Sequence, residues 1–93
     1  MNKKKLIKAR KEIDKIDNNI FKLIKKRTSV VKQMLALKDL KNQIVDHKRI
    51  NIILKKIRKK SIVNGVDTKI TKKIWRSMIW SYLDFQKRNF KKR

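Results

Sequence analysis

Three cations lie where the helical pattern of this chain predicts apolar side chains. Between residues 4 and 40, apolar residues recur at alternating steps of three and four, which is typical of a helix packed in a bundle. Arg27 occupies one position of this apolar face, and Arg10 and Lys38 each lie one residue beside it. Cations are costly to bury among apolar side chains unless an anion joins them, so the spacing predicts an anion-binding site inside a helical bundle. The apolar members of the face are Leu6, Ala9, Ile13, Ile16, Ile20, Leu23, Val30, Met34 and Leu37.

Composition limits the fold and the chemistry. The chain has 93 residues with no Cys, no Pro and a single Gly, so little interrupts a helix, and we expect one all-α domain over residues 1–93. The lack of Cys excludes disulfides and thiolate metal sites. His47 is the only histidine and has no matching ligands nearby in sequence, so we expect no metal and no cofactor.

The charge balance raises two other classes of partner. Thirty Lys and Arg face seven acidic residues, a formal charge of +23 that is typical of proteins binding nucleic acid or anionic membranes. A basic helical nucleic-acid-binding protein would explain this charge, but not cations within an apolar face. Most lysines fall on predicted exposed faces, so we expect no nucleic acid partner. No apolar run approaches the roughly 20 residues of a membrane span, and we expect a cytoplasmic protein without a membrane partner.

The pattern predicts three helices, at about residues 4–40, 47–63 and 68–90. Asp46 and Asp67 are expected to cap the second and third helices, and Asn64-Gly65 to end the second. The expected inner face of the third helix comprises Ile70, Ile74, Met78, Tyr82 and Phe85.

The length of the first helix predicts a dimer. It would extend about 55 Å, whereas a compact domain of this size is only about 30–35 Å across. We therefore expect an intertwined homodimer in which a second copy covers the rest of the apolar face. Arg27 and Lys38 are about 16 Å apart on one face and could hold one small molecule. Arg10 is about 25 Å from Arg27, so it would complete the site of the partner chain.

At these positions the chain resembles the all-helical (AroQ-type) chorismate mutase superfamily. The segment Arg10-x-x-Ile13-Asp14-x-x-Asp17 is similar to the first-helix motif of that family. The spacing of Arg10, Arg27, Lys38 and Arg49 is also similar, as are Asn64-Gly65-Val66-Asp67 and the position of Gln86. The resemblance implies a pericyclic rearrangement of a dicarboxylate, chorismate, to prephenate in phenylalanine and tyrosine biosynthesis.

The resemblance also implies a role for each polar residue. Arg27 and the Arg10 of the partner would bind the two carboxylates, and Lys38 and Gln86 would donate hydrogen bonds to the ether oxygen. Arg49 would help position the substrate. Asp46 would accept from the ring hydroxyl or simply cap its helix. No covalent intermediate or general base is needed, so catalysis would depend on holding a compact conformer and stabilising separated charge.

Two residues depart from the mutase pattern. Ile50 stands where typical mutases have a Glu that binds the ring hydroxyl, and Tyr82 stands where they have a small hydroxyl residue. Both changes, and the stretch 78–82, resemble the isochorismate-pyruvate lyases of salicylate and siderophore synthesis. We expect a mutase, with the lyase as the alternative that Ile50 and Tyr82 favour. A non-catalytic relative that binds a pathway partner is a third hypothesis.

Overall fold

The computed structural model describes residues 2–91, which form three α-helices and one short 3₁₀ helix. These are α1 (Lys3–Ala36), η1 (Lys41–Gln43), α2 (His47–Val63) and α3 (Thr68–Asn89). No strand occurs among the described residues, which confirms the all-α prediction. The chain divides into two compact units, Met1–Val30 and Val31–Arg93, called here the first and second units. The expected single domain over 1–93 stays a prediction.

The first unit consists of most of α1. Asn2 begins the helix: its side-chain oxygen accepts from the Lys5 N–H at 3.1 Å, and its carbonyl accepts from the Leu6 N–H at 3.1 Å. None of residues 2–30 is buried, and a single helix has no core of its own in which to bury an apolar face. The large exposed apolar residues of this unit are Ile7, Ile13, Ile16, Ile20, Phe21, Leu23, Ile24 and Val30.

The first helix is shorter than the predicted span 4–40, because it ends at Ala36. The N–H groups of Leu37 and Lys38 bond three residues back, to the carbonyls of Met34 and Leu35, both at 3.1 Å. Such bonds tighten and end a helix. The next two N–H groups, of residues 39 and 40, donate to the side-chain oxygen of Gln43, both at 2.9 Å. Lys38 therefore lies in a structured loop and not on the helix.

The ends of α2 and α3 confirm their predicted caps. The Asp46 carboxylate accepts from the Arg49 N–H at 3.0 Å, and the Asp67 carboxylate accepts from the Lys69 N–H at 2.7 Å. Gly65 has φ +67°, the left-handed conformation that glycine adopts without steric cost. The Gly65 N–H donates to the Ile62 carbonyl at 3.3 Å, and the next N–H donates to the carbonyl of residue 61 at 2.9 Å. This pair of bonds is a Schellman motif.

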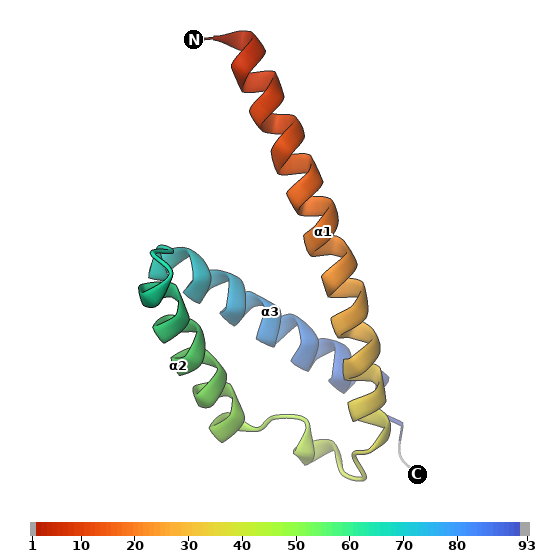
Figure 1. Ribbon diagram of the computed structural model, residues 1–93. Helices are drawn as coiled ribbons and strands as arrows, with labels where there is room; N and C mark the ends of the chain where they lie inside the picture. Colours follow the sequence, from red (N-terminus) through yellow and green to blue (C-terminus); the bar gives the residue numbers. More distant parts are fainter. Residues whose placement is uncertain (1, 92–93) are drawn as a thin grey trace. The chain divides into compact units, whose positions relative to one another are not determined.

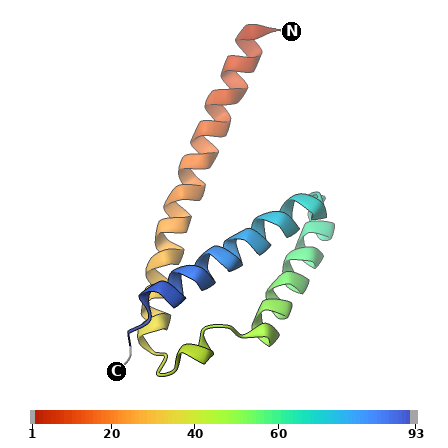
Figure 2. The same ribbon diagram turned by 180° about the vertical axis from the view of Figure 1, so that it is seen from behind.

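Helices α2 and α3 run side by side in opposite directions as a hairpin, in both views of the ribbon (Figures 1 and 2). Near the turn, the Ser61 hydroxyl donates to the Ile57 carbonyl at 2.6 Å and lies 2.8 Å from the Thr71 hydroxyl. Ser61 is buried, and these bonds offset the cost of removing its hydroxyl from water. The two helices are therefore joined by a polar contact close to the turn.

The core of the second unit is small and centres on the connection between α1 and α2. Ile44, exposed by only 2 %, packs with Ile79 and Leu83 of α3. The side chains that surround this cluster are Leu35, Val45, Ile50, Ile53, Leu54 and Phe90.

The inner face of α3 differs from the predicted one. Its buried residues are Ile79, Leu83 and Gln86, whereas Ile70 and Ile74 are 56 % and 52 % exposed in the single chain. Helix α3 carries apolar residues on more than one stripe, and packing against Ile44 selects the stripe that is buried. Both tryptophans lie on this helix: Trp75 is half-buried, and Trp80 is 67 % exposed.

Candidate functional site

A lysine and a glutamine 48 residues apart meet in the second unit. The Lys38 ammonium donates a hydrogen bond of 2.9 Å to the side-chain oxygen of Gln86. Gln86 is only 8 % exposed, and Lys38 is half-buried. Both residues were predicted from the sequence to belong to one site, and the structure brings their side chains together.

The two side chains reach this position from elements that pack on one core. Gln86 follows Leu83 by three residues and Ile79 by seven, so it continues the buried face of α3 by one turn. Lys38 lies between the end of α1 and Ile44, which packs on that same face. The burial of Ile44 and Leu83 therefore holds the loop of Lys38 close to the turn of α3 that carries Gln86.

Lys38 and Gln86 have several hydrogen-bond donors besides the N–H that joins them to each other. An ammonium has three N–H donors and no acceptor, so Gln86 must present its oxygen to Lys38. The amide NH₂ of Gln86 is then directed away from the ammonium with two further donors. A positive charge and a neutral amide placed together in this way can stabilise negative charge that develops on an oxygen atom.

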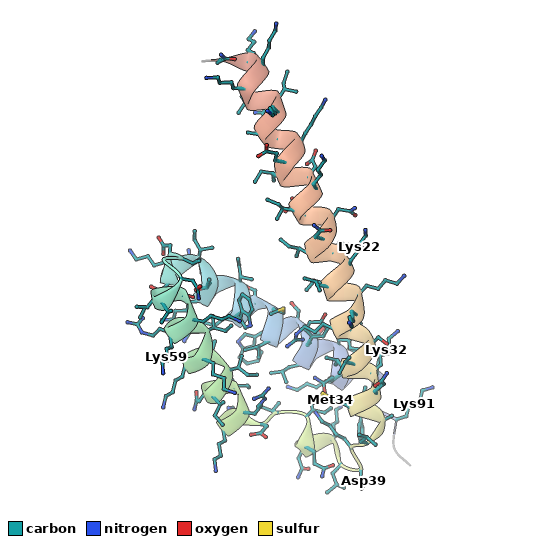
Figure 3. The ribbon with its side chains drawn as sticks, viewed as in Figure 1. Lys22, Lys32, Met34, Asp39, Lys59 and Lys91 are labelled. Carbon is teal, nitrogen blue, oxygen red and sulfur yellow. The ribbon has the colours of Figure 1, made fainter. Side chains whose placement is uncertain are left out.

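A hollow of about 470 Å³ lies beside Lys38, a size suited to a small molecule. Lys32 and Lys91, both labelled in Figure 3, are two further lysines among its lining residues. Its lining comes from the end of α1, the following loop and the C-terminal end of α3: Lys32, Leu35, Ala36, Lys38, Phe85, Asn89 and Lys91. The lining combines apolar surface with cations, and an anionic small molecule would fit this chemistry.

The other predicted site residues of the second unit are distributed around α2 and α3. Asp46 and Arg49 meet through the cap of α2, and both residues are exposed. One oxygen of Asp46 therefore caps the helix, and a further role in substrate binding stays a prediction for both residues. Tyr82 is half-buried one turn before Gln86 on α3. Ile50 packs against the core cluster.

The two remaining cations belong to the first unit. Arg10 is exposed and Arg27 is half-buried on the continuous helix α1. They are 17 residues apart, about 25 Å along the axis, so one chain cannot direct both at one small molecule. Their place in a common site with Lys38 stays a prediction.

Residues 2–91 offer no candidate for a metal site or a membrane span. No three His, Asp or Glu side chains gather there in a group able to hold a metal ion. None of the helices in this part of the chain has the length and apolar character needed to span a membrane.

Comparison with known proteins identifies the class of this helical fold. The model of the family "Chorismate mutase type II" matches residues 9–87, a span that includes α2 and the predicted site residues from Arg10 to Gln86. The chain therefore belongs to the chorismate mutase type II family, and it is an enzyme of the kind that isomerises chorismate.

A curated relative agrees with this assignment. The chain is 41 % identical over 76 residues to the chorismate mutase of Methanocaldococcus jannaschii, and the match covers 81 % of this chain and 77 % of that protein. No solved structure matches the chain significantly. Neither the family nor the relative supports the isochorismate-pyruvate lyase alternative.

Proposed function

We propose that this chain converts chorismate to prephenate with Lys38 and Gln86 as its central catalytic residues, in a homodimer. The observation that carries the site assignment is the 2.9 Å hydrogen bond between the Lys38 ammonium and the buried Gln86 amide. Family membership supports the reaction, and the dicarboxylate nature of chorismate matches the excess of cations in the chain.

The rearrangement is intramolecular and moves no proton. The ether C–O bond of chorismate breaks as a new C–C bond forms, and negative charge grows on the ether oxygen in the transition state. Lys38 would donate a second N–H to that oxygen while keeping its bond to Gln86, and the Gln86 NH₂ would donate beside it. Because these donors are already held together, little reorganisation is needed as the charge develops.

The arginines would bind the substrate's two carboxylates. Arg27 of one chain and Arg10 of the partner would each form paired N–H···O bonds with one carboxylate. The carboxylate-binding roles come from the resemblance to the family, and the spacing along α1 supports the use of the partner's Arg10, since the distance from Arg10 to Arg27 exceeds the reach of one ligand. The exposed apolar face of residues 7–30 supports the dimer, because a second copy of the helix would cover it.

The packing of Ile50 weakens the case for the lyase. The sequence pattern treats Ile50 as a departure toward that branch, but its side chain packs against Ile44, Ile79 and Leu83. An apolar residue at this position is therefore explained by the core, whichever substrate is bound. Tyr82 and the stretch 78–82 that contains it are then the remaining features that resemble the lyase branch.

Separate incubation with two substrates tests the proposal. Purified protein is mixed with chorismate, and its disappearance and the formation of prephenate are followed. A parallel sample receives isochorismate, and salicylate and pyruvate are measured. We expect rapid formation of prephenate from the first sample. Salicylate and pyruvate from the second sample, with little prephenate from the first, would reverse the assignment.

A further inference from the structure

A single side chain organises the loop that carries Lys38. The N–H groups of four consecutive residues, 37 to 40, all have hydrogen-bond acceptors. The first two bond to carbonyls of α1, and the next two bond to one atom, the side-chain oxygen of Gln43. The Gln43 N–H in turn donates to the Leu40 carbonyl at 3.1 Å, so residues 40 and 43 are joined by reciprocal bonds.

We propose that Gln43 is a positioning residue for catalysis, which acts by fixing the backbone after Lys38 so that its ammonium stays on Gln86. This inference rests on the proposed role of Lys38. It adds a residue that acts through the backbone N–H groups of residues 39 and 40, and that neither periodicity nor the motif spacing indicates.

The loop is held at both ends, and Gln43 supplies the bonds between them. At one end, Lys38 donates to Gln86 of α3. At the other, Ile44 packs against Ile79 and Leu83 of the same helix. Residues 37–46 contain no Gly or Pro whose special geometry would define a turn. Without the Gln43 oxygen, the N–H groups of residues 39 and 40 would bond to water, and the backbone beside Lys38 would gain alternative conformations.

The chemistry of the contact predicts which substitutions are tolerated. Only the oxygen of the Gln43 amide takes part in the bonds to residues 39 and 40. A Glu at this position keeps an oxygen of the same reach, whereas Met keeps the length but has no comparable acceptor. Gln43 is exposed, so Gln43→Met removes no core packing and should leave the helices folded.

The test measures kcat and KM for chorismate in Gln43→Met, Gln43→Ala and Gln43→Glu, with Asn42→Ala as the matched control on the exposed neighbour. We expect Gln43→Met and Gln43→Ala to lower kcat by about 10- to 100-fold, since a displacement of about 1 Å costs up to about 100-fold in rate. KM should change much less, because Lys38 acts mainly in the transition state. Gln43→Glu should keep kcat near that of the parent, and Asn42→Ala should change neither constant.

Amide hydrogen exchange supplies a readout of the loop itself. Exchange at Asp39 and Leu40 should accelerate in Gln43→Met and stay slow in Gln43→Glu, with circular dichroism confirming that both variants are helical. A kcat within twofold of the parent in Gln43→Met, or equal losses in the Met and Glu variants, would overturn the proposal. Lys38→Ala distinguishes a failure of the proposed site from a failure of the role of Gln43. If Lys38→Ala keeps full activity, the proposed site is wrong. If Lys38→Ala is inactive and Gln43→Met is active, only the role of Gln43 is wrong.

Discussion

The two units of this chain differ in what covers their apolar side chains. In residues 2–30, a single helix presents its apolar face without burying any residue. In the second unit, Ile44, Ile79 and Leu83 form a core, and Gln86 is buried on the same face of α3. The second unit therefore holds its polar pair with its own packing, whereas the first has residues suited to a site but no internal core to support them.

This difference indicates separate roles for the two units in the proposed site, one in the chemical step and one in substrate binding. The donors that would act on the breaking bond lie in the unit with a core, where their geometry depends on contacts within one chain. The arginines that would bind carboxylates lie on the unit that a second copy would cover in the proposed dimer. Assembly would then control substrate binding, and the fold of one chain would control the chemical step.

The largest expected effect concerns a cation of the first unit. Arg27→Ala should lower kcat/KM by about 100- to 1000-fold, because the substrate carboxylate would lose a charged, paired donor. Steady-state kinetics with chorismate measures this loss. Circular dichroism and sedimentation should show an unchanged helical dimer. Near-normal activity would mean that the first unit contributes less to the site than we propose.

Truncations of apolar side chains in the two units should destabilise the protein in different ways. Leu83→Ala should lower the free energy of unfolding by about 2–5 kcal/mol, because it removes a buried side chain from the core of one chain. Ile16 is 52 % exposed in the single chain, so Ile16→Ala should destabilise the protein only through the dimer.

Urea unfolding at several protein concentrations measures both effects. The unfolding midpoint of the parent and of both variants should rise with concentration. The stability that Ile16→Ala loses relative to the parent should come from a lower affinity between the two chains of the dimer. A midpoint that does not depend on concentration would contradict the dimer.

Mixed dimers test whether the units of two chains complete each other. Arg10→Ala and Arg27→Ala chains should each be inactive alone. If sites are shared, a mixed dimer has one intact site of two, and random pairing makes about half of the dimers mixed. An equal mixture refolded together should therefore recover about a quarter of the parent activity. Lack of recovery in verified mixed dimers would argue that Arg10 acts elsewhere.

The smallest expected effect is confined to the second unit. Gly65→Ala should lower the free energy of unfolding by about 1 kcal/mol, because alanine is strained at φ +67° although no atom lies within 4 Å of the added methyl group. Thermal unfolding measures the loss, and kcat should not change. A drop in kcat would show that the α2–α3 turn influences the Lys38–Gln86 pair.

Local signals in the sequence predicted the hairpin well, because caps and stops depend on neighbouring residues. The predicted spans 47–63 and 68–90 agree with the observed helices to within one residue, and Asp46, Asp67 and Gly65 have their predicted roles. The meeting of Lys38 and Gln86 was predicted because their types and positions match a family pattern. The arrangement of the arginines was also predicted from spacing, and the mixed-dimer experiment tests it.

The sequence predictions were wrong where tertiary contacts decide between conformations that the local sequence allows equally. The apolar pattern continues past Ala36, but bonds to the Gln43 side chain and the anchor at Ile44 end α1 there. The pattern of α3 likewise offers more than one apolar stripe, and only the packed structure shows which stripe is buried. The role of Gln43 had no signal in the periodicity, because it depends on a side chain that folds back on its own loop.

The location of both tryptophans makes the difference between the units visible in solution. Trp75 and Trp80 lie on α3, and residues 2–30 contain no tryptophan. Intrinsic fluorescence therefore reports on the surroundings of α3 alone, whereas far-ultraviolet circular dichroism records the helix of both units. If the long helix loosens before the hairpin as temperature rises, the dichroism curve will fall first and the emission spectrum will shift later. One unlabelled sample can thus report the order in which the two units melt.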